Sequence, residues 1–593
     1  MALLLVAFLS LSFPSLTLGK HHEDAIHFGL IQLGGSLSAH PSRLGQPSPK
    51  LNPICKDDKI TSAISPPSVS IKSAELVTAA WEMSASSDYQ PSTSDWIGFY
   101  CGDFLSTVPD EAFFDWVYVT QDQVQNKAGS IDLKLKSGRM NNCEFRFFNH
   151  DDGTSYCRIG VSSKVTITDA KTVVSQRHLA LTEMQGEMRI SWTAGTGEAP
   201  MVEFSTTKDL ANSVKVEGNC HTYKQIDMCE EPANNNAGFV EPGQLCSAVM
   251  AELEVDKLYY YRVTSDGKEF SDVTQFRSSP PTYDPDYSHS YIVYGDMGTF
   301  SDSGASLATA DISTAQVLTD NVRSIHHFGD ISYARGESST WDVWFDLVEP
   351  YASRVPYMIT IGNHEFDYTN GEEMDPSNEP HFKPDWFNGG SDSEGECGVP
   401  MHNRFTMPDN GNGIFWYKFV YANVLTIMLS SEHDLGEGSN QYNFLEAALK
   451  AVDRKVTPWV ILEFHRPMYN NEAYESDYAV AVGMQAEFED LLVEYDVDLV
   501  LAGHYHSYLR SKRIYKDMIN EEKGIYHFTI GSGGASIDDQ GLYEKDWVET
   551  FSLQFGIGKI NVMNSTHILW EFIENKDNNN TGAVTDSVWI VKR

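Results

Sequence analysis

The sequence predicts a multidomain protein in which N-terminal β-sandwich domains precede an α/β domain. A chain of 593 residues is too long for a single hydrophobic core, and its 41% hydrophobic content supplies enough apolar surface for several. Up to about residue 281 the apolar residues alternate in short runs separated by turns. From about residue 288 apolar β runs alternate with segments of helical periodicity, a pattern typical of α/β layers.

The first 66 residues are expected to lie outside the folded domains. Residues 1–19 resemble a secretory signal peptide, with an apolar stretch over 2–13 and small residues at the end, although no Lys or Arg precedes the stretch. That stretch is too short to span a bilayer, and no later segment is long enough. Residues 20–66 are rich in His, Ser, Pro and Gly, which predicts a flexible leader. We therefore expect a secreted, extracellular or vacuolar–lysosomal protein.

Two β domains follow. Over residues 67–168, alternation such as Val77, Ala79 and Trp81 predicts an N-terminal β domain. Over residues 169–281, Met188, Ile190 and Trp192 fall on one face of a strand, and turn residues separate similar runs. This second region is expected to form a fibronectin III-like β-sandwich.

The α/β domain is expected over residues 288–593, including a C-terminal segment from about 556. Strands are predicted at 291–294, 325–328, 357–361, 459–464 and 498–502, and helices near 311–323, 440–453 and 480–495. In such sheets ligands bind beyond the carboxyl ends of the strands.

Five short polar segments each follow one of these predicted strands. They read Gly295-Asp296-Met297-Gly298, Gly329-Asp330-Ile331-Ser332-Tyr333, Gly362-Asn363-His364-Glu365, Phe464-His465-Arg466 and Gly503-His504-Tyr505-His506. Carboxylate and phenolate suit a trivalent ion, whereas imidazole and amide oxygen suit divalent Zn, Fe or Mn. A shared Asp can hold two ions about 3.5–4 Å apart, the spacing used to activate water on a phosphoryl group. Polar caps on buried strands would explain one such segment but not five in this order.

These segments resemble those of the purple acid phosphatases, within the metallophosphoesterase superfamily. The specific mark is Tyr333, three residues after the second Asp. The resemblance covers roughly residues 170–593 and extends to Gly395–Pro400, Glu432-His433-Asp434 and the tail Asp586-Ser587-Val588. These further matches are similar to the large plant-type members, and the family implies a catalytic domain of two sheets flanked by helices.

Carried over residue by residue, the resemblance implies a complete dimetal site. Its members would be Asp296, Tyr333 and His506 on Fe(III), Asn363, His465 and His504 on a divalent ion, Asp330 bridging the two, and His364 contacting the substrate phosphate. The implied activity is that of a secreted acid phosphatase, which hydrolyses phosphate monoesters and phosphoanhydrides by direct attack of a metal-bound hydroxide. The alternatives are a nucleotide pyrophosphatase/phosphodiesterase on the same site, or a non-catalytic surface binding protein.

The net charge of −40 restricts the partners. It excludes a general nucleic-acid binder, which needs an excess of Lys and Arg at the phosphates. It also opposes long-range attraction of anions, so a phosphate site must carry local positive charge, which an Fe(III)–divalent pair would supply. The expected partners are phosphorylated small molecules or nucleotides.

One departure from the family pattern concerns the proton donor. Many plant members carry His nine to ten residues beyond the position of His465, where this chain has Tyr474 and Glu475. Glu475 could serve only if its pKa were raised. Two further segments are ambiguous: His433 could approach the phosphate or play an ordinary polar role, and the acidic stretch 375–396 is expected to be a solvated loop.

The eight cysteines predict disulfides in an exported chain, and none has the Cys-x-x-Cys spacing of a zinc site. Cys143 with Cys157, and Cys220 with Cys229, are close enough in sequence to pair locally, although the sequence leaves the connectivity open. Asn564 and Asn579 lie in possible glycosylation sequons.

Overall fold

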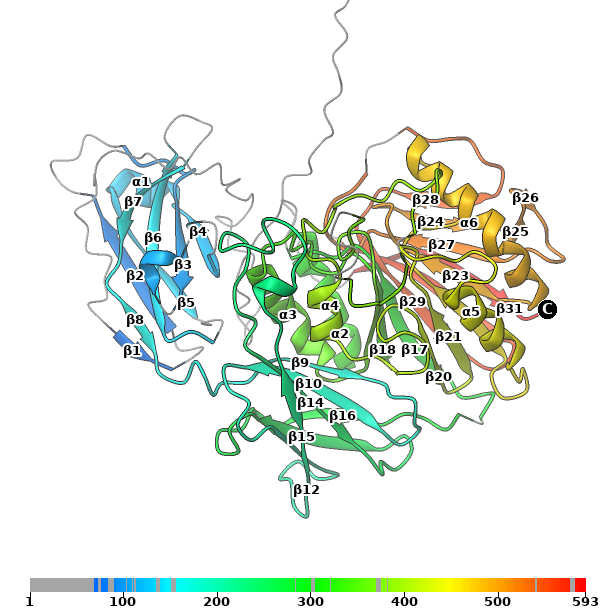
Figure 1. The fold of residues 1–593 in the computed structure, drawn as a ribbon, viewed down its shortest axis with the longest axis horizontal. Coiled ribbons are helices and arrows are strands. Elements are labelled where there is room, and N and C mark those ends of the chain that lie inside the picture. Colours follow the sequence, from blue (N-terminus) through cyan, green and yellow to red (C-terminus); the bar gives the residue numbers. More distant parts are fainter. Residues whose placement is uncertain are drawn as a thin grey trace, which may run out of the picture.

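A computed structural model describes most of the chain after the predicted leader. The described residues are 69–72, 76–83, 90–102, 104–108, 110, 113–134, 139–150, 156–282, 284–299, 304–319, 322–368, 375–380, 382–538, 541–575 and 582–593. The predicted signal peptide and leader, and the sequon at Asn579, lie outside them. The chain forms an N-terminal β domain, a second β domain and a large α/β domain (Figure 1). The multidomain architecture expected from the sequence is therefore confirmed.

The N-terminal domain pairs a six-stranded sheet with a two-stranded one. Its elements are β1 (Val69–Ile71), β2 (Leu76–Glu82), β3 (Trp96–Cys101), η2 (Leu105–Thr107), β4 (Asp115–Tyr118), α1 (Gln121–Asn126), β5 (Ala128–Lys134), β6 (Asn142–His150), β7 (Tyr156–Val161) and β8 (Val165–Ile167). The larger sheet has the order β1-β8-β6-β3-β4 with β7 beside β6, and the smaller one pairs β2 with β5.

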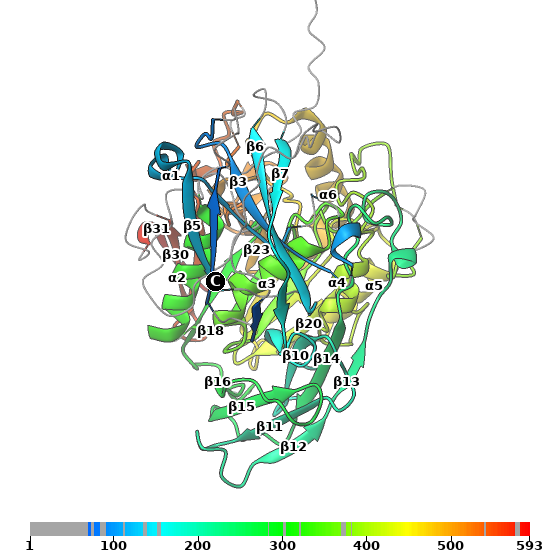
Figure 2. The same cartoon turned by 90° about the vertical axis from the view of Figure 1, so that its left-hand side faces the viewer.

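Strand β3 is buried on both faces. Ile97 and Phe99 belong to the core inside the domain, whereas Trp96 and Tyr100 belong to an aromatic cluster that includes Val343 of helix α3 (Ser339–Ala352). Figure 2 shows β3, β6 and β7 in front of the α/β domain, with α3 behind them. The outer aromatic face of this domain therefore packs against the α/β domain.

The second β domain is a sandwich of two four-stranded sheets, ordered β13-β14-β10-β9 and β12-β11-β15-β16. Its elements are β9 (Ser175–Ala180), β10 (Met188–Ala194), β11 (Met201–Ser205), β12 (Val214–Glu217), β13 (Asn219–His221), η3 (Gln225–Asp227), β14 (Gln244–Met250), β15 (Leu258–Thr264) and β16 (Thr274–Arg277). Met188, Ile190 and Trp192 are all buried, as their alternation on β10 predicted.

The α/β domain contains two large sheets. The first has the order β19-β18-β17-β29-β30-β31, with β17 (His289–Tyr294), β18 (Val322–Phe328), β19 (Tyr357–Thr360), β29 (Gly556–Val562), β30 (His567–Glu574) and β31 (Ala583–Val591). The second has the order β20-β21-β22-β23-β27-β24-β28, with β20 (Tyr417–Tyr421), β21 (Val424–Met428), β22 (Trp459–Glu463), β23 (Leu499–Ala502), β24 (Tyr508–Ser511), β27 (Tyr526–Ile530) and β28 (Val548–Ser552). A short hairpin joins β25 (Ile514–Tyr515) to β26 (Met518–Ile519).

The two sheets pack together, with helices outside them. His326 on β18 lies 2.9 Å from the Glu463 carboxylate on β22, so neighbouring strands of the two sheets are in contact. Figure 1 shows α2 (Ala305–Thr319), α3 and α4 (Val399–Arg404) on one side, and α5 (Asn440–Lys450) and α6 (Glu475–Glu494) on the other. Among the described residues, no helix combines the length and the apolar character that crossing a bilayer requires.

One helix prediction needs correction, and helix α3 was not predicted. The predicted helix at 311–323 begins earlier, at Ala305, and its last residues belong to β18, because the helix ends at Thr319 and the chain re-enters the sheet at Val322. No helix was predicted at α3, most of whose residues are buried, including the polar Ser339, Thr340 and Asp342.

Both local disulfide pairings are wrong. The structure joins Cys101 to Cys143, Cys220 to Cys246 and Cys229 to Cys397. The first two pairs stand opposite each other on adjacent strands, β3 with β6 and β13 with β14. Strand register, not closeness in sequence, brought these Cα atoms within 4.1 and 4.0 Å.

Candidate metal centre

The proposed ligands meet at the carboxyl ends of strands from both sheets. Asp296 and Asp330 follow β17 and β18, whereas His465 and His504 follow β22 and β23. Because the first sheet supplies the carboxylates and the second supplies imidazoles, the site exists only where the two sheets pack together. This is the strand-end position expected for ligands of such sheets.

Several of these loops have strained backbones. Asp296, Asp330, Tyr333 and His504 all have positive φ angles, of 59°, 51°, 53° and 70°. Non-glycine residues rarely occupy this left-handed region, and they cluster there at functional sites. The tight turns aim each side chain back over the end of its strand.

Glycine is required before Asp330 because the loops pack closely. A Cβ atom on Gly329 would lie 2.6 Å from Nδ1 of His465 and against the backbone of Gly362. Any larger residue at this position would push the two sheets' loops apart. The Gly-Asp pattern seen in the sequence thus has a packing cause.

One half of the centre surrounds the Tyr333 hydroxyl. Tyr333 Oη lies 2.7 Å from Nε2 of His506, 3.1 Å from Oδ1 of Asp296 and 3.2 Å from Oδ2 of Asp330. All four side chains are buried. Asp296, Asp330 and His506 can direct one ligand atom each to a common point, since these atoms lie within 4.8 Å of one another.

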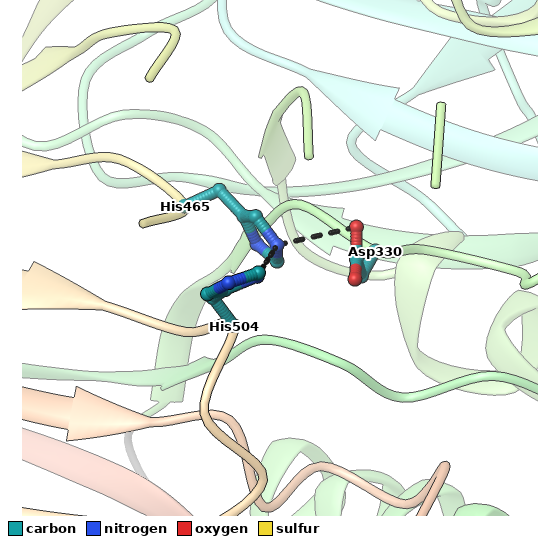
Figure 3. Close-up of side chains that lie close together, drawn as sticks. All are labelled: Asp330, His465 and His504. Atoms are coloured by element: carbon teal, nitrogen blue, oxygen red, sulfur yellow. Dashed lines mark hydrogen bonds and ion pairs between the residues drawn. The ribbon is translucent and has the colours of Figure 1, made fainter. Parts of the chain in front are cut away.

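The other half places three neutral metal-ligand side chains, Asn363, His465 and His504, around the same Asp330. Oδ1 of Asn363 lies 2.9 Å from Nε2 of His465 and 3.0 Å from Nδ1 of His504, and Nε2 of His465 lies 3.2 Å from Oδ1 of Asp330. Figure 3 shows Asp330, His465 and His504 converging. These three form a second group with ligand atoms within 4.8 Å. Asp330 is the member common to both groups.

The chemistry of this donor set fits metal ions. Nδ1 of His465 lies 3.0 Å from the Phe328 carbonyl oxygen, which can only accept, so Nδ1 carries the proton of the neutral ring. The lone pair on Nε2 then faces the oxygens of Asn363 and Asp330. Acceptors that face one another require a cation between them. Burial lowers the pKa of His465, but the carboxylates of Asp330 and Asp296 outweigh it and raise that pKa to about 9, so Nε2 holds either a proton or a metal ion and the site favours positive charge.

A second layer of contacts, which the sequence analysis missed, holds the loops in place. The Glu365 carboxylate accepts the backbone N–H groups of Asp330, Ile331 and Gly362 at 2.7–3.0 Å. Ser536 Oγ lies 2.5 Å from Nδ1 of His506. Glu365 stands inside a quoted motif and could have been suspected, whereas Ser536 gives no sequence signal.

His364 lies beside the ligand atoms rather than among them. Its Nε2 is 3.8 Å from Oδ2 of Asp330, its ring centroid is 4.4 Å from that of Tyr333, and its side chain is partly exposed. Its Nδ1 lies 3.0 Å from the main-chain oxygen of Asp392. Contact between His364 and a substrate phosphate stays a prediction.

The residues in doubt as proton donors lie at the start of α6. Tyr474 is exposed, and the side chain of Glu475 lies outside what the structure describes. Asp477, which the sequence analysis did not name, is closer to the centre: its Oδ2 lies 3.6 Å from Nε2 of His504, and its Oδ1 lies 3.6 Å from Arg466. Burial raises the pKa of Asp477, but His504, Arg466 and Asn388 outweigh it and hold that pKa well below its usual range.

His433 and the acidic loop have structural roles. His433 is buried, with Nδ1 2.8 Å from Ser430 Oγ and Nε2 3.1 Å from Ser377 Oγ, which favours the polar role over a phosphate contact. The expectation that residues 375–396 form a solvated loop is wrong in part, because Ser377, Ser393 and Glu396 are buried. The reason is that Asp367 accepts the backbone N–H groups of Ser393 and Gly395, which draws the loop onto the domain.

Comparison with known families gives three consecutive matches. Residues 174–278 match the model of the purple acid phosphatase N-terminal domain, residues 291–508 that of the calcineurin-like phosphoesterases, and residues 524–587 that of the iron/zinc purple acid phosphatase-like protein C. The first of these coincides with the second β domain.

Individual relatives agree with these models. The chain is 31% identical to "Probable inactive purple acid phosphatase 9" of Arabidopsis thaliana, covering 82% of this chain and 77% of that protein. It is 31% identical to a "Nucleotide pyrophosphatase/phosphodiesterase" of Hordeum vulgare, covering 53% and 85%. The structure of purple acid phosphatase PPD1 from yellow lupin (Lupinus luteus) seeds matches with a TM-score of 0.75 and 27% identity, covering 87% of this chain and 93% of that one. The chain therefore belongs to the purple acid phosphatase family.

Proposed function

We propose that this protein is an active dimetal acid phosphatase that hydrolyses phosphate monoesters and phosphoanhydrides. The observation that carries the proposal is the sharing of Asp330 between two converging ligand groups. Two groups with one common carboxylate are the arrangement needed to hold two ions close together. The purple acid phosphatase fold itself implies such a dimetal centre.

The two halves differ in the ions they suit. Asp296, Tyr333 and His506, with Asp330, would hold Fe(III), because carboxylate and phenolate are hard anionic donors. Asn363, His465 and His504, with Asp330, would hold a divalent ion such as Zn, Fe or Mn. When bound, the pair would supply an activated water as nucleophile and positive charge for the phosphoryl oxygens. His364, at the open edge, would donate a hydrogen bond from Nε2 to a phosphate with its ring protonated, because its Nδ1–H is directed at the Asp392 carbonyl.

The chain's own residues favour substrates that need little proton transfer to the leaving group. The carboxylate beside His504 is Asp477, and a group whose pKa is this low has no proton to give near neutral or mildly acidic pH. Tyr474 is exposed at the surface. We therefore propose a preference for phosphoanhydrides and aryl esters over alkyl phosphates.

A nucleotide pyrophosphatase/phosphodiesterase activity on the same site is the second candidate. It is favoured by the barley relative of that name. It also fits the low pKa of Asp477, since a nucleoside monophosphate leaves readily without protonation. Comparing ATP, bis-aryl phosphodiester and aryl monophosphate turnover separates the two activities.

A non-catalytic surface protein is the third possibility, and some relatives are named "probable inactive". The converging ligand set supports catalysis instead. The test is metal analysis of the purified protein with a visible spectrum and turnover of an aryl phosphate at acidic pH. We expect two metal ions per chain, a visible band and turnover. Protein that binds both ions but turns over neither ester nor anhydride would overturn the proposal.

We also propose that the chain enters the secretory pathway. Three described disulfides support an oxidising compartment. Expression of the full chain in a eukaryotic host, followed by N-terminal sequencing of the exported protein, should show cleavage near Gly19. Retention of the intact N-terminus inside the cytosol would contradict it.

A further inference from the structure

Asp392 contacts two residues of the centre with two different groups. Its Oδ2 accepts a hydrogen bond from Nδ2 of Asn363 at 3.1 Å. Its main-chain oxygen lies 3.0 Å from Nδ1 of His364. Neither contact involves a predicted ligand atom, so Asp392 binds no ion itself, and its two hydrogen bonds act on the centre by orienting these two side chains.

The carboxylate of Asp392 selects one orientation of the Asn363 amide. A side-chain amide can rotate so that either its oxygen or its NH₂ group faces a given neighbour. Because an ionised carboxylate only accepts, it requires the NH₂ group on its own side. Oδ1 is then directed at Nε2 of His465 and Nδ1 of His504, at 2.9 and 3.0 Å. Without Asp392 the opposite orientation would place an N–H group where the divalent ion needs an oxygen.

The main-chain carbonyl of Asp392 selects the tautomer of His364. A carbonyl oxygen only accepts, so Nδ1 of His364 must carry hydrogen. That leaves Nε2 directed at the side of the centre, 3.8 Å from Oδ2 of Asp330. A side-chain substitution at Asp392 removes the contact with Asn363 but keeps the main-chain contact with His364. The two contacts can therefore be separated by experiment.

The loop around Asp392 is anchored even though Asp392 itself is exposed. The Asp367 carboxylate accepts the backbone N–H groups of Ser393 and Gly395 at 2.9 Å each. The disulfide between Cys229 and Cys397 ties the end of the loop to the second β domain, and Cys229 N donates to the Gly395 carbonyl at 2.9 Å. A fixed backbone is what a positioning residue needs to hold its partners within the narrow tolerance of a site.

We infer that Asp392 is a positioning residue of the divalent half of the centre: its carboxylate fixes the oxygen of Asn363 toward that ion, and its carbonyl fixes the ring of His364. This inference rests on the proposed function, because it needs an ion at Asn363, His465 and His504. It predicts that changing the Asp392 side chain weakens the divalent half and spares the Tyr333 half. No described residue of the Tyr333 half is bonded to Asp392.

The test compares Asp392→Leu and Asp392→Asn with a matched control, Asp385→Leu, which removes an equally exposed carboxylate from the same loop. The iron-containing holoprotein is titrated with a chelator while divalent metal content and the visible band are followed. Because loss of an outer-shell partner typically costs about 10–100-fold in metal affinity, Asp392→Leu should release its divalent ion at that much lower chelator concentration. Asp392→Asn should fall between Asp392→Leu and the wild type, since its amide oxygen can still accept but its NH₂ group can also turn toward Asn363. The control should match the wild type.

The outcomes separate the two ideas. If the wild type holds two metals and Asp392→Leu resists the chelator equally, the positioning role is wrong. If iron and band are lost together with the divalent ion, the loop has only a general structural role, and the inference is overturned. A wild type that binds no metal refutes the proposed function instead. Double variants give a second test. The loss of kcat/KM caused by Asp392→Leu should add to the loss caused by His364→Ala, but it should not add to the loss caused by Asn363→Ala. Additivity with Asn363→Ala would also overturn the inference.

Discussion

The two halves of the metal centre share Asp330 but are built in different ways. The Tyr333 half combines a phenol and two carboxylates with one imidazole, and Asp296 within it is completely buried. The other half combines an amide and two imidazoles; its His465 is also completely buried, but its His504 side chain is 13% exposed. Negative charge is therefore concentrated in the Tyr333 half, which we call the deeper half; the half with Asn363, His465 and His504 is the outer half. Under the proposed function, this difference would suit the deeper half to a trivalent ion and the outer half to a divalent one.

The halves also differ in what holds them in place. Asp296 and Tyr333 of the deeper half have positive φ, as does the shared Asp330, and so does His504 of the outer half. Partners behind the ligands differ more: Ser536 lies behind His506 in the deeper half. In the outer half the exposed Asp392 lies behind Asn363, and the Phe328 carbonyl lies behind His465. Point mutations should therefore tune the outer half more easily than the deeper one.

The largest effect should come from Asp330→Asn. This substitution damages both halves at once, because Asp330 is the residue common to them. Charge stabilisation by a metal ion is worth several kcal/mol, so we expect kcat/KM to fall by about 10³-fold or more and both metals to bind less tightly. The measurement is turnover with metal content. Glu217→Gln, on an exposed strand of the second β domain, is the control. Two retained metals with near-normal turnover would refute the bridging role.

The next largest effect concerns proton donation to the leaving group beside the outer half. The neighbouring carboxylate, Asp477, has a pKa too low to supply that proton. General-acid help is worth about 10²–10⁴ in rate. We therefore expect kcat/KM for ATP and for an aryl phosphate to exceed that for glycerol phosphate by about 10²-fold or more at the same acidic pH. Glu475→His should then help the alkyl substrate selectively. Equal values for all three substrates would mean that another residue supplies the proton.

Tyr333→Phe tests the deeper half by itself. A phenolate on Fe(III) should give a charge-transfer band in the visible, so the wild-type protein should be coloured and the variant should lose the band while keeping its fold. Its loss of activity should be smaller than that of Asp330→Asn, because Asp330 serves both ions. Tyr505→Phe removes a nearby buried hydroxyl outside the ligand groups and should keep the colour. A colourless wild type with full iron and activity would contradict the role of Tyr333.

The smallest effect concerns the pH dependence of stability, and it compares a histidine of the metal centre with a buried histidine of the second sheet. His465 and His527 are both buried, but carboxylates raise the pKa of His465, whereas burial alone lowers the pKa of His527 to about 3. The unfolded state therefore takes up a proton at His527 as pH falls through about 6.5, and the folded state does not. This residue should cost about 2 kcal/mol of stability at pH 5 relative to pH 7.

The variant His527→Phe measures that cost. Its difference in unfolding free energy between pH 7 and pH 5 should be smaller than that of the wild type by this amount. Any packing change affects both pH values equally and cancels. An unchanged pH difference would show that His527 is protonated in the folded protein.

Local patterns determined much of this protein. The alternation of Met188, Ile190 and Trp192 predicted a strand because a pleated strand directs every second side chain toward the same core. The five polar segments predicted a strand-end site because each motif contains its own turn and its own donor. Purple acid phosphatase membership followed from the same segments, and Tyr333 was its most specific sign.

Other features were decided only in three dimensions. The disulfides follow strand register, as in Cys101 with Cys143, which sequence proximity does not reveal. Asp392 and Ser536 lie far along the chain from Asn363 and His506, and an Asp or Ser in a loop has no periodicity that announces a partner. The sequence by itself determined which donors exist and at which strand ends they stand. Only the packing of the two sheets decided which donors share an ion and what holds them, because those contacts depend on distances between loops that no local pattern encodes.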